Sequence, residues 1–269
     1  MFDSLFADGS QPVIGMVHLH PLPGAPKFDG DRSAILDAAE RDARRLAAGG
    51  VDAIMVENFG DAPFYPDDVP KHVVASMTRA ARAVVETVDV PVGVNVLRND
   101  GAAALSVAAA VGADFVRINV HTGSRVTDQG VVDGKAHETM RLRERLGADV
   151  AVLADHDVKH SAPIAAGDFT AESVADGVER GLADGIVVSG SGTGHETARS
   201  DLEHAVDRRD ANDLDVPVLV GSGVDADNVD DLLDLADGVI VGTALKEDGD
   251  VGKPVSEERV RALVDAARS

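Results

Sequence analysis

One pattern constrains this chain more than any other: a short apolar run rich in β-branched residues, a turn and an amphipathic stretch follow one another eight times. Alternating strands and helices predict a parallel sheet, because each crossover helix returns the chain to the same end of the sheet. Eight such units in 269 residues predict a single domain over residues 1–269, a closed (β/α)8 TIM barrel. The expected strands are Val13–Leu19, Val51–Asn58, Pro91–Leu97, Asp114–Val120, Val150–Asp157, Gly185–Gly190, Val216–Val224 and Gly238–Leu245.

The stretches between these runs have the spacing of amphipathic helices. In the first of them, alanine and leucine form a narrow apolar stripe, and Gly49 and Gly50 end it. The strands, by contrast, are nearly unbroken in their apolar character, which suits a sheet covered by helices. The expected helices are Asp31–Gly50, Val69–Val88, Gly101–Val111, His137–Leu146, Thr170–Leu182, Asp201–Ala211, Asp225–Leu235 and Ser256–Ala267.

Composition excludes several classes of function. The chain has no cysteine, so it has no disulfide, no thiolate metal site and no thiol nucleophile. No apolar run approaches the roughly 20 residues that cross a bilayer, and the start, Met1–Gln11, lacks the basic region of a signal peptide. We therefore expect a cytoplasmic protein without direct membrane insertion.

The charge of the chain is strongly acidic, with 47 Asp and Glu against 25 Lys and Arg and a net charge of −22. Such a surface repels nucleic acid and anionic lipid, so neither is an expected partner. The acids are spread along the whole chain, which favours the solvated acidic shell of a halophilic protein over an acidic face for one basic partner. A homo-oligomer formed through helix faces stays open as a hypothesis.

Polar side chains stand where the first three strands end, which is where such a barrel carries its active site. With a period of two, His18 and His20 share a face with Ile14 and Met16, so both histidines are expected in the barrel mouth. The second strand ends with Glu57 and Asn58, and the third carries Asn95, followed by Arg98 and Asn99.

The fourth strand carries a charged residue that should point inward. Arg117 and Asn119 share one face, and the outer face of a barrel strand is apolar. A buried arginine needs a partner. We expect either that a carboxylate such as Glu57 or Asp155 pairs with it or that it also holds an anionic substrate.

The fifth strand ends in the densest polar cluster of the chain. Asp155 and Asp157 share a face, and Lys159 and His160 follow directly. The preceding loop, Thr122–Ala136, is longer than usual, which is compatible with a lid over a ligand or with a plain surface loop.

Glycine turns follow the last three strands. Phosphate sites in such barrels commonly use the loops after strands seven and eight, because glycine lets backbone N–H groups approach phosphate oxygens. Hydroxyl groups of Ser222 and Thr243 stand within these turns. The candidate phosphate-binding residues are Gly190, Gly192, Thr193, Gly221, Ser222, Gly223, Gly242 and Thr243.

Seven segments of this chain resemble the BtpA/SgcQ family. The resemblance runs from the first strand to the last, and its most specific parts are the proline-rich opening and the Asn-Val-Leu-Arg-Asn-Asp segment. The matching segments are Val13–Pro26, Val56–Phe64, Gly93–Asp100, Phe115–Val120, Thr127–Gly130, Ala154–His160 and Ser189–Gly194.

The resemblance implies a barrel like those that bind ribulose phosphates, and it implies two kinds of function. Members of the family are labelled membrane-complex biogenesis proteins, and some are labelled phosphoribosylanthranilate isomerase. The isomerases are known for a cysteine base at the end of the first strand, whereas this chain has no cysteine and places His18 at roughly that position.

The first hypothesis is an enzyme that acts by proton transfer on a small phosphorylated sugar or nucleotide-derived metabolite, as an isomerase, epimerase or lyase. The candidate catalytic residues are His18, Asp155, Arg117 and Glu57, because His and a tuned carboxylate move protons and Arg stabilises negative charge. A Schiff-base lysine is less expected, because no Lys stands on the sixth strand. The candidate substrate-binding residues are His20, Asn95, Asn119, Asp157, Lys159 and His160.

Two further hypotheses remain open. The cofactor is unknown, but a divalent metal bound by His18, Glu57 and Asp155 would use suitable nitrogen and oxygen ligands. Alternatively, the chain is a non-catalytic assembly factor for a membrane protein complex. A small phosphate ester that stabilises the fold would favour the enzyme, and a co-purifying membrane partner would favour assembly.

Overall fold

The strands close into the expected parallel barrel. The computed structural model describes residues 2–156, 160–164, 173–190, 197 and 199–269. Its barrel has the strand order β1-β11-β10-β9-β7-β4-β3-β2, and each neighbouring pair is parallel. The strands are β1 (Val13–His18), β2 (Ala53–Glu57), β3 (Val92–Asn95), β4 (Phe115–Ile118), β7 (Ala151–His156), β9 (Gly185–Val188), β10 (Val218–Val220) and β11 (Gly238–Val241). The (β/α)8 prediction is confirmed.

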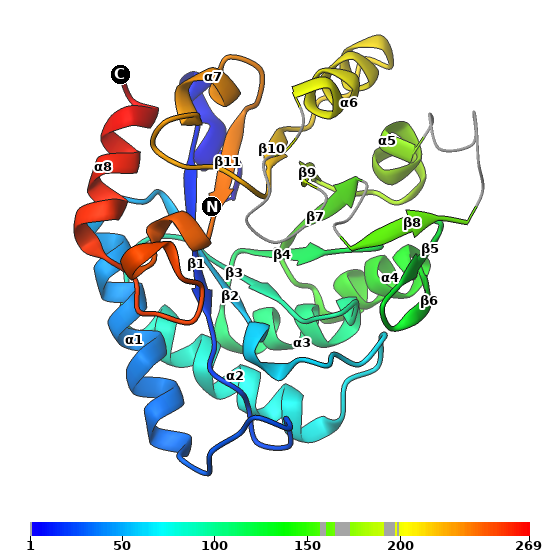
Figure 1. The fold of residues 1–269 in the computed structure, drawn as a ribbon. Helices are drawn as coiled ribbons and strands as arrows, with labels where there is room; N and C mark the ends of the chain where they lie inside the picture. The colour runs from blue at the N-terminus through cyan, green and yellow to red at the C-terminus, as the bar shows by residue number, and fades with distance from the viewer. Residues whose placement is uncertain (1, 157–159, 165–172, 191–196, 198) are drawn as a thin grey trace.

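Helices cover the outside of the barrel (Figure 1). Local chemistry sets their ends: the Asp31 carboxylate accepts hydrogen bonds from the backbone N–H groups of Ser33 and Ala34 at the start of α1, and Gly50, with φ of 95°, ends that helix. The helices are α1 (Arg32–Gly49), α2 (Lys71–Val85), α3 (Gly101–Val111), α4 (Ala136–Leu146), α5 (Ser173–Ala175) continued by the π-helical turn η3 (Asp176–Arg180), α6 (Arg199–Ala211), α7 (Val229–Leu233) and α8 (Glu257–Ala267).

Two large apolar clusters form most of the core. One lies between strands and helices and includes Val13 and Val17 of β1, and the other fills the barrel and includes Ile14 and Met16 of the same strand. The period of two expected for β1 is therefore confirmed. The short N-terminal helix η1 (Phe2–Gly9), which the sequence pattern does not predict, closes the barrel floor, where the Phe2 ring lies 5.6 Å from that of Phe115.

The loop Thr122–Ala136 contains a β-hairpin rather than an irregular segment. Its strands β5 (Ser124–Thr127) and β6 (Gly130–Asp133) pair antiparallel, and β5 also pairs with β8 (Ser161–Pro163) from the loop after β7. Figure 1 shows this small sheet beside α4, apart from the barrel. The two loops after β4 and β7 thus hold each other in place.

Three other short helices complete the described chain, namely η2 (Phe59–Asp61), η4 (Thr243–Leu245) and η5 (Glu247–Gly249). The expected helix Asp225–Leu235 is shorter than predicted, because its regular part begins only after Asn228, whose side chain binds the backbone of Gly223 and Asp225. Within the described part of the chain, no helix has the length and apolar character needed to cross a membrane.

Candidate functional site

A ring of polar side chains crosses four adjacent strands at the carboxyl end of the barrel. The strand register aligns His18 with Glu57, Glu57 with Asn95, and Asn95 with Arg117. These residues lie one layer above the apolar barrel interior, since β1 places His18 on the same face as Ile14 and Met16. The structure therefore brings together four residues that the sequence pattern placed at strand ends.

Arg117 and Asp155 form the central ion pair of the mouth. The Arg117 Nε donates to Asp155 Oδ1 at 2.7 Å and its Nη2 donates to Oδ2 at 2.9 Å, and both side chains are almost fully buried. Nη2 also donates to the Ser189 hydroxyl at 3.0 Å, and Asn119 donates to Asp155 at 2.8 Å. Of the two carboxylates expected for Arg117, Asp155 is the one that binds it. Two parallel hydrogen bonds fix the plane of the guanidinium.

The electrostatics of Arg117 follow from this pairing. Burial acts to lower the pKa of the guanidinium, but the Asp155 carboxylate and, more weakly, Glu57 oppose it, so that the pKa is raised. Arg117 is therefore a permanent cation beneath the mouth. Asn95 lies beside it, donating to the Arg117 carbonyl at 2.7 Å, and the buried Asn95 Oδ1 has no hydrogen-bond partner.

His18 and Glu57 form the second pair at the mouth. The His18 Nε2 lies 3.7 Å from Glu57 Oε1, and the imidazole packs against the Phe59 ring with 4.7 Å between ring centroids. A side chain at position 242 would place its Cβ 2.8 Å from His18 Cε1. Glycine at 242 therefore gives the imidazole the room to lie over the start of the β11 loop.

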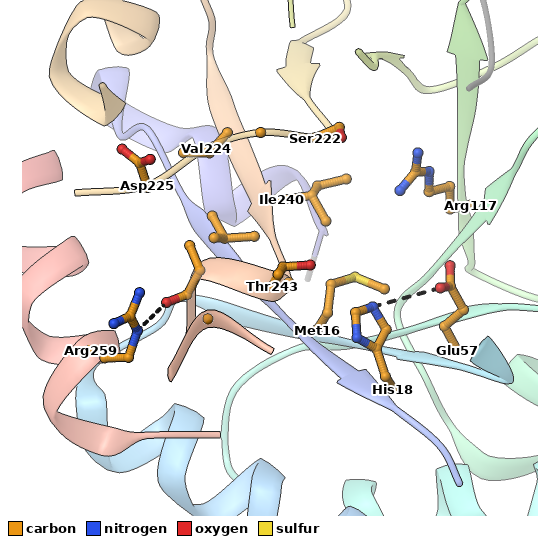
Figure 2. A pocket seen from close by; sticks show the side chains of 16 residues that line it. Met16, His18, Glu57, Arg117, Ser222, Val224, Asp225, Ile240, Thr243 and Arg259 are labelled. Atoms are coloured by element: carbon orange, nitrogen blue, oxygen red, sulfur yellow. Dashed lines mark hydrogen bonds and ion pairs between the residues drawn. The ribbon is translucent and has the colours of Figure 1, made fainter. Parts of the chain in front are cut away.

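A cavity of about 220 Å³ opens above these pairs, between β1 and the loops after β10 and β11. Figure 2 shows His18, Glu57 and Arg117 on one side of it and Thr243, Asp225 and Arg259 on the other. The Arg259 Nε donates to the Ala244 carbonyl at 2.7 Å, which anchors an exposed cation from α8 at the rim. The cavity is lined also by Gly221, Ser222, Gly223 and Gly242.

Two of these glycines are required by the structure, one by close packing and one by its backbone conformation. A Cβ at 221 would lie 2.8 Å from Ser189 Oγ and 3.2 Å from Arg117 Nη2, so glycine lets the β10 loop approach the central network. Gly223 has φ of 71°, a conformation that other residues rarely adopt. The turns thus have a structural reason for glycine in addition to the one expected from phosphate binding.

A larger cavity of about 560 Å³ adjoins the first, and His18 and Glu57 line both. His20, His160 and Asn119, which the sequence pattern placed at strand ends, line this second cavity. It also contains Arg98 and the buried pair of Lys246 and Asp42, whose Nζ and Oδ2 lie 2.9 Å apart. Burial lowers the pKa of Lys246, and the Asp42 carboxylate opposes this shift.

A third cavity of about 650 Å³ lies on the other side of the mouth, between the hairpin and η3. Asn119 and Asp155 line it together with His121. Among the described residues, the mouth is therefore divided into compartments that meet at the polar ring.

Some polar residues of the strand ends hold loops. The Asn58 Oδ1 accepts from the Leu97 backbone N–H at 2.7 Å, and the Asn99 Oδ1 accepts from the Val120 N–H at 2.7 Å. Asp100 caps α3 by accepting from the Ala103 N–H and also accepts from the Val69 N–H. Their hydrogen bonds explain why the Asn-Val-Leu-Arg-Asn-Asp segment needs amide and carboxylate groups there.

Other candidates are placed differently or lie outside the description. Gly190 lies two residues after the end of β9 and is buried, but the described lining of the first cavity does not include it. Asp157, Lys159, Gly192 and Thr193 lie outside the described residues. The divalent metal stays a prediction: within the described ranges no three His, Asp or Glu side chains are placed to hold an ion, and Asp155 is already bound by Arg117 and Asn119.

The sequence pattern did not single out Ser189, which binds Arg117, or three residues that line these cavities. Ser189 directly follows β9, so its position was a usable signal, and the sequence pattern marked Arg98 only as a residue that follows the third strand. Lys246 follows β11 at a distance of five residues, and Arg259 lies on α8, so neither is on a strand end. Only the closed fold brings the last two to the mouth.

Comparison with known proteins gives the family. The BtpA family model matches residues 9–269. The chain belongs to the BtpA family. It is 47% identical over 255 residues, or 95% of this chain and 87% of the other, to a Synechocystis protein named "Photosystem I biogenesis protein BtpA". It is 49% identical to an uncharacterized protein of Thermococcus kodakarensis, covering 96% of this chain and 95% of that protein.

Solved structures with the same fold have distant sequences. The N-(5'-phosphoribosyl)anthranilate isomerase of Pyrococcus furiosus is similar with a TM-score of 0.57 and 15% identity, over 96% of this chain and 98% of that one. A Mycobacterium tuberculosis tryptophan synthase structure has a TM-score of 0.63 and 19% identity, over 100% of this chain and 96% of that one. At these identities the likeness shows the TIM-barrel fold alone.

Proposed function

We propose that this BtpA-family chain is an enzyme that acts by proton transfer on a small phosphorylated sugar or nucleotide-derived metabolite. The observation that carries the proposal is the first cavity, in which the loops after β10 and β11 face His18 and Glu57 across about 220 Å³. If the loops held the phosphate of a ligand, the atoms next to the phosphate would lie against His18 and Glu57. The reaction class is isomerisation, epimerisation or lyase-type cleavage.

The loops supply a place for the phosphate. Gly221, Gly223 and Gly242 bring backbone close to the cavity, and Ser222 and Thr243 carry hydroxyl groups there. Arg259 adds a cation at the rim, fixed by its hydrogen bond to the Ala244 carbonyl. Backbone N–H groups, hydroxyl groups and a guanidinium are the usual donors to phosphate oxygens.

His18 and Glu57 are the groups that would move protons. A histidine titrates near neutral pH, and a carboxylate 3.7 Å away orients its ring and stabilises the imidazolium once it forms. In an isomerisation, one of the pair takes a proton from the carbon beside a carbonyl or imine and the other returns a proton to the neighbouring atom. The Phe59 ring holds the imidazole at the junction of the two cavities.

Arg117 would stabilise the negative charge that develops when the proton leaves. For Asp155 the proposal departs from the catalytic role that the sequence suggested, because its oxygens accept three hydrogen bonds from Arg117 and Asn119 and its side chain is fully buried. We assign Asp155 to positioning the guanidinium. Proton transfer then belongs to His18 and Glu57.

A thermal-shift comparison of ligands tests the proposal. Ribose 5-phosphate and glucose 6-phosphate are compared with ribose and glucose in high salt, because a ligand that binds only the folded chain raises the unfolding midpoint. We expect the phosphate esters to raise the midpoint and the free sugars to leave it unchanged. Arg259→Gln, at an exposed position, should reduce the shift without harming the fold.

A matched pair of charge variants sharpens this test. Ser222→Asp places a carboxylate in the phosphate cavity, and Ser106→Asp places the same charge on the exposed face of α3. The first should abolish the shift and the second should keep it. Equal midpoints for esters and free sugars, or an unchanged shift in Ser222→Asp, would contradict a phosphate site in this cavity.

One observation favours a second candidate function. The Synechocystis relative at 47% identity is named a photosystem I biogenesis protein, so assembly of a membrane protein complex is the alternative to catalysis. Variants His18→Asn and Glu57→Gln discriminate the two in a host that depends on the protein. An enzyme loses function in both variants, whereas an assembly factor keeps function as long as the variants fold.

A further inference from the structure

We propose that the second, larger cavity of the mouth binds a second anionic group of the same substrate, with Arg98 as its central ligand. The inference rests on the proposed function, because it takes the phosphate to be in the first cavity. It makes the substrate a doubly anionic small molecule: a phosphate at one end, a carboxylate or second phosphate at the other, and the reacting atoms between them.

Arg98 is a buried cation whose hydrogen-bonding capacity is only partly used. Its side chain is 5% exposed, and its Nε has no hydrogen-bond partner. The carboxylate oxygen of Asp128 lies 3.9 Å from Nη2, beyond hydrogen-bond distance, and belongs to a side chain that is 63% exposed. Buried guanidinium groups are normally bound by carboxylates at short range, so an incoming anion would complete this one.

The surroundings hold the guanidinium in place without neutralising it. Its Cζ lies 5.8 Å from the centre of the Phe64 ring, a cation–π distance, and the Arg98 backbone N–H donates to the Tyr65 carbonyl at 3.0 Å. Both contacts come from the loop after β2. These two contacts fix the backbone and the guanidinium of Arg98 at the wall of the cavity.

The charge of this cavity differs from that of the whole chain. Among the described residues, its lining has four cationic side chains against three carboxylates, in a protein with a net charge of −22. Three of the six lysines of the chain are among these cations. The lining cations are Lys27, Arg98, Lys246 and Lys253, and the carboxylates are Asp42, Glu57 and Asp128. Such local enrichment focuses an anion into the cavity.

Two of the three carboxylates are already engaged. Asp42 is bound by Lys246 at 2.9 Å and by Arg41 at 3.0 Å, and Glu57 is paired with His18. Lys246 and Asp42 both line the cavity, and their charges offset each other. In the part of the chain that the structure describes, Arg98 is then the buried charge that a ligand would meet.

The two cavities are arranged in series. His18 and Glu57 line both, so a molecule with one anionic group near Ser222 and another near Arg98 would pass directly over the pair assigned to proton transfer. Anchoring both ends would fix the reacting carbon against His18, which is how an enzyme gains rate from parts of the substrate that do not react.

Calorimetric titration of the whole protein with three related ligands tests the inference. Glucose 6-phosphate carries one anionic group, 6-phosphogluconate adds a carboxylate, and glucose 1,6-bisphosphate adds a phosphate. We expect at least one of the two doubly anionic ligands to bind roughly ten-fold or more tightly than glucose 6-phosphate, since a charge-assisted hydrogen bond is being added. The ligand that gains more identifies the second group.

Variants assign the gain to Arg98. Arg98→Met should remove the preference for the doubly anionic ligand and leave glucose 6-phosphate binding unchanged, Arg98→Lys should keep part of the preference, and Arg79→Met, at an exposed position of α2, should change nothing. Equal affinity of the wild type for all three ligands, or a preference that survives in Arg98→Met, would overturn the second site and leave the proposed function standing. Failure of all three ligands to bind would overturn the phosphate site as well.

Discussion

Two arginines lie buried in the same barrel mouth and differ in how their charge is met. Arg117 is bound by both oxygens of Asp155 and by the Ser189 hydroxyl, at 2.7 to 3.0 Å. Arg98 is similarly buried, but its Nε has no partner and its nearest carboxylate oxygen lies 3.9 Å away on an exposed side chain. Burial is thus shared, and the difference lies in the internal partners.

This difference separates positioning from binding. Removing a charge from water costs several kcal/mol. Where partners inside the protein offset this cost, the charged side chain becomes a fixed part of the folded structure. Arg117 is such a part, and it can act on a ligand only through the N–H groups that remain. A charge that is only partly met inside the protein gains more from a ligand, which is why Arg98 is the better anchor for an anion.

Replacement of Arg117 is expected to have the largest effect. Arg117→Met leaves the Asp155 carboxylate buried without its cation, so we expect the free energy of unfolding to fall by about 3–5 kcal/mol. Urea denaturation of wild type and variant measures this. The double variant Arg117→Met/Asp155→Leu removes both charges and should recover most of the loss. If Arg117→Met were as stable as the wild type, the ion pair with Asp155 would not stabilise the fold, and the contrast between Arg117 and Arg98 would be wrong.

The second prediction concerns His18, where the two cavities meet. Gly242→Ala would place a Cβ 2.8 Å from His18 Cε1, so the imidazole must move away from Phe59 or the β11 loop must shift. Overpacking of this kind costs about 1–3 kcal/mol, and we expect binding of phosphate esters to weaken with it. Gly252→Ala, on an exposed loop of the same face, is the matched control and should stay within about 0.5 kcal/mol of the wild type. Unaltered stability and ligand binding in Gly242→Ala would show that the imidazole is not held where the structure places it.

The sequence predicted the polar ring well because local rules determine it. A period of two puts His18 on the face of Ile14 and Met16, and the same rule turns Arg117 inward. The partner of Arg117 needed more than periodicity. Asp155 lies on β7, the direct neighbour of β4, whereas Glu57 lies two strands away across β3. Register and side-chain reach, which decide between them, are properties of the closed barrel.

The elements that the sequence did not predict depend on distant parts of the chain. The strands of the hairpin are four residues long, too short for a clear pattern, and β5 pairs with β8 from a loop more than thirty residues further on. Arg259 occupies an exposed face of a helix, and Arg98 follows a strand by three residues. The place of Arg259 at the mouth follows from tertiary contacts, for which the sequence carries no local signal. For Arg98 the sequence indicated the place after the strand, whereas its lack of a close carboxylate depends on the fold.

His121 is also buried near the barrel mouth, but unlike the two arginines it can lose its charge. Burial lowers the pKa of His121 from its usual 6.5, although its Nε2–H donates to the Gly181 carbonyl at 2.8 Å. The neutral ring is therefore favoured in the folded state. Its contribution to stability is fully present above pH 6.5 and is lost as the pH falls through the lowered pKa, because the unfolded chain binds the extra proton in that window.

A pH series of urea denaturation measures this contribution. The stability of His121→Gln relative to the wild type should rise as the pH falls below 6.5, by at most about 1.4 kcal/mol per pH unit for one proton. Asp184 and Arg143 also act on the His121 pKa, in opposite directions and more weakly than burial. A constant difference between the two proteins from pH 7.5 to 5 would mean that His121 titrates alike in both states.

The smallest expected effect on stability belongs to Arg98, and it is the sharpest test of the comparison. Arg98→Met keeps an apolar stem of similar length while removing a cation whose nearest carboxylate is exposed at 3.9 Å and whose ring contact with Phe64 contributes about 0.5–1 kcal/mol. We therefore expect the free energy of unfolding in urea to change by no more than about 1 kcal/mol, several-fold less than for Arg117→Met. A loss as large as that of Arg117→Met would mean that the fold already meets the Arg98 charge, and a ligand would then gain little by binding there. A small loss of stability together with a lost preference for doubly anionic ligands is the combination that only a binding residue gives, since a structural residue would change the two together.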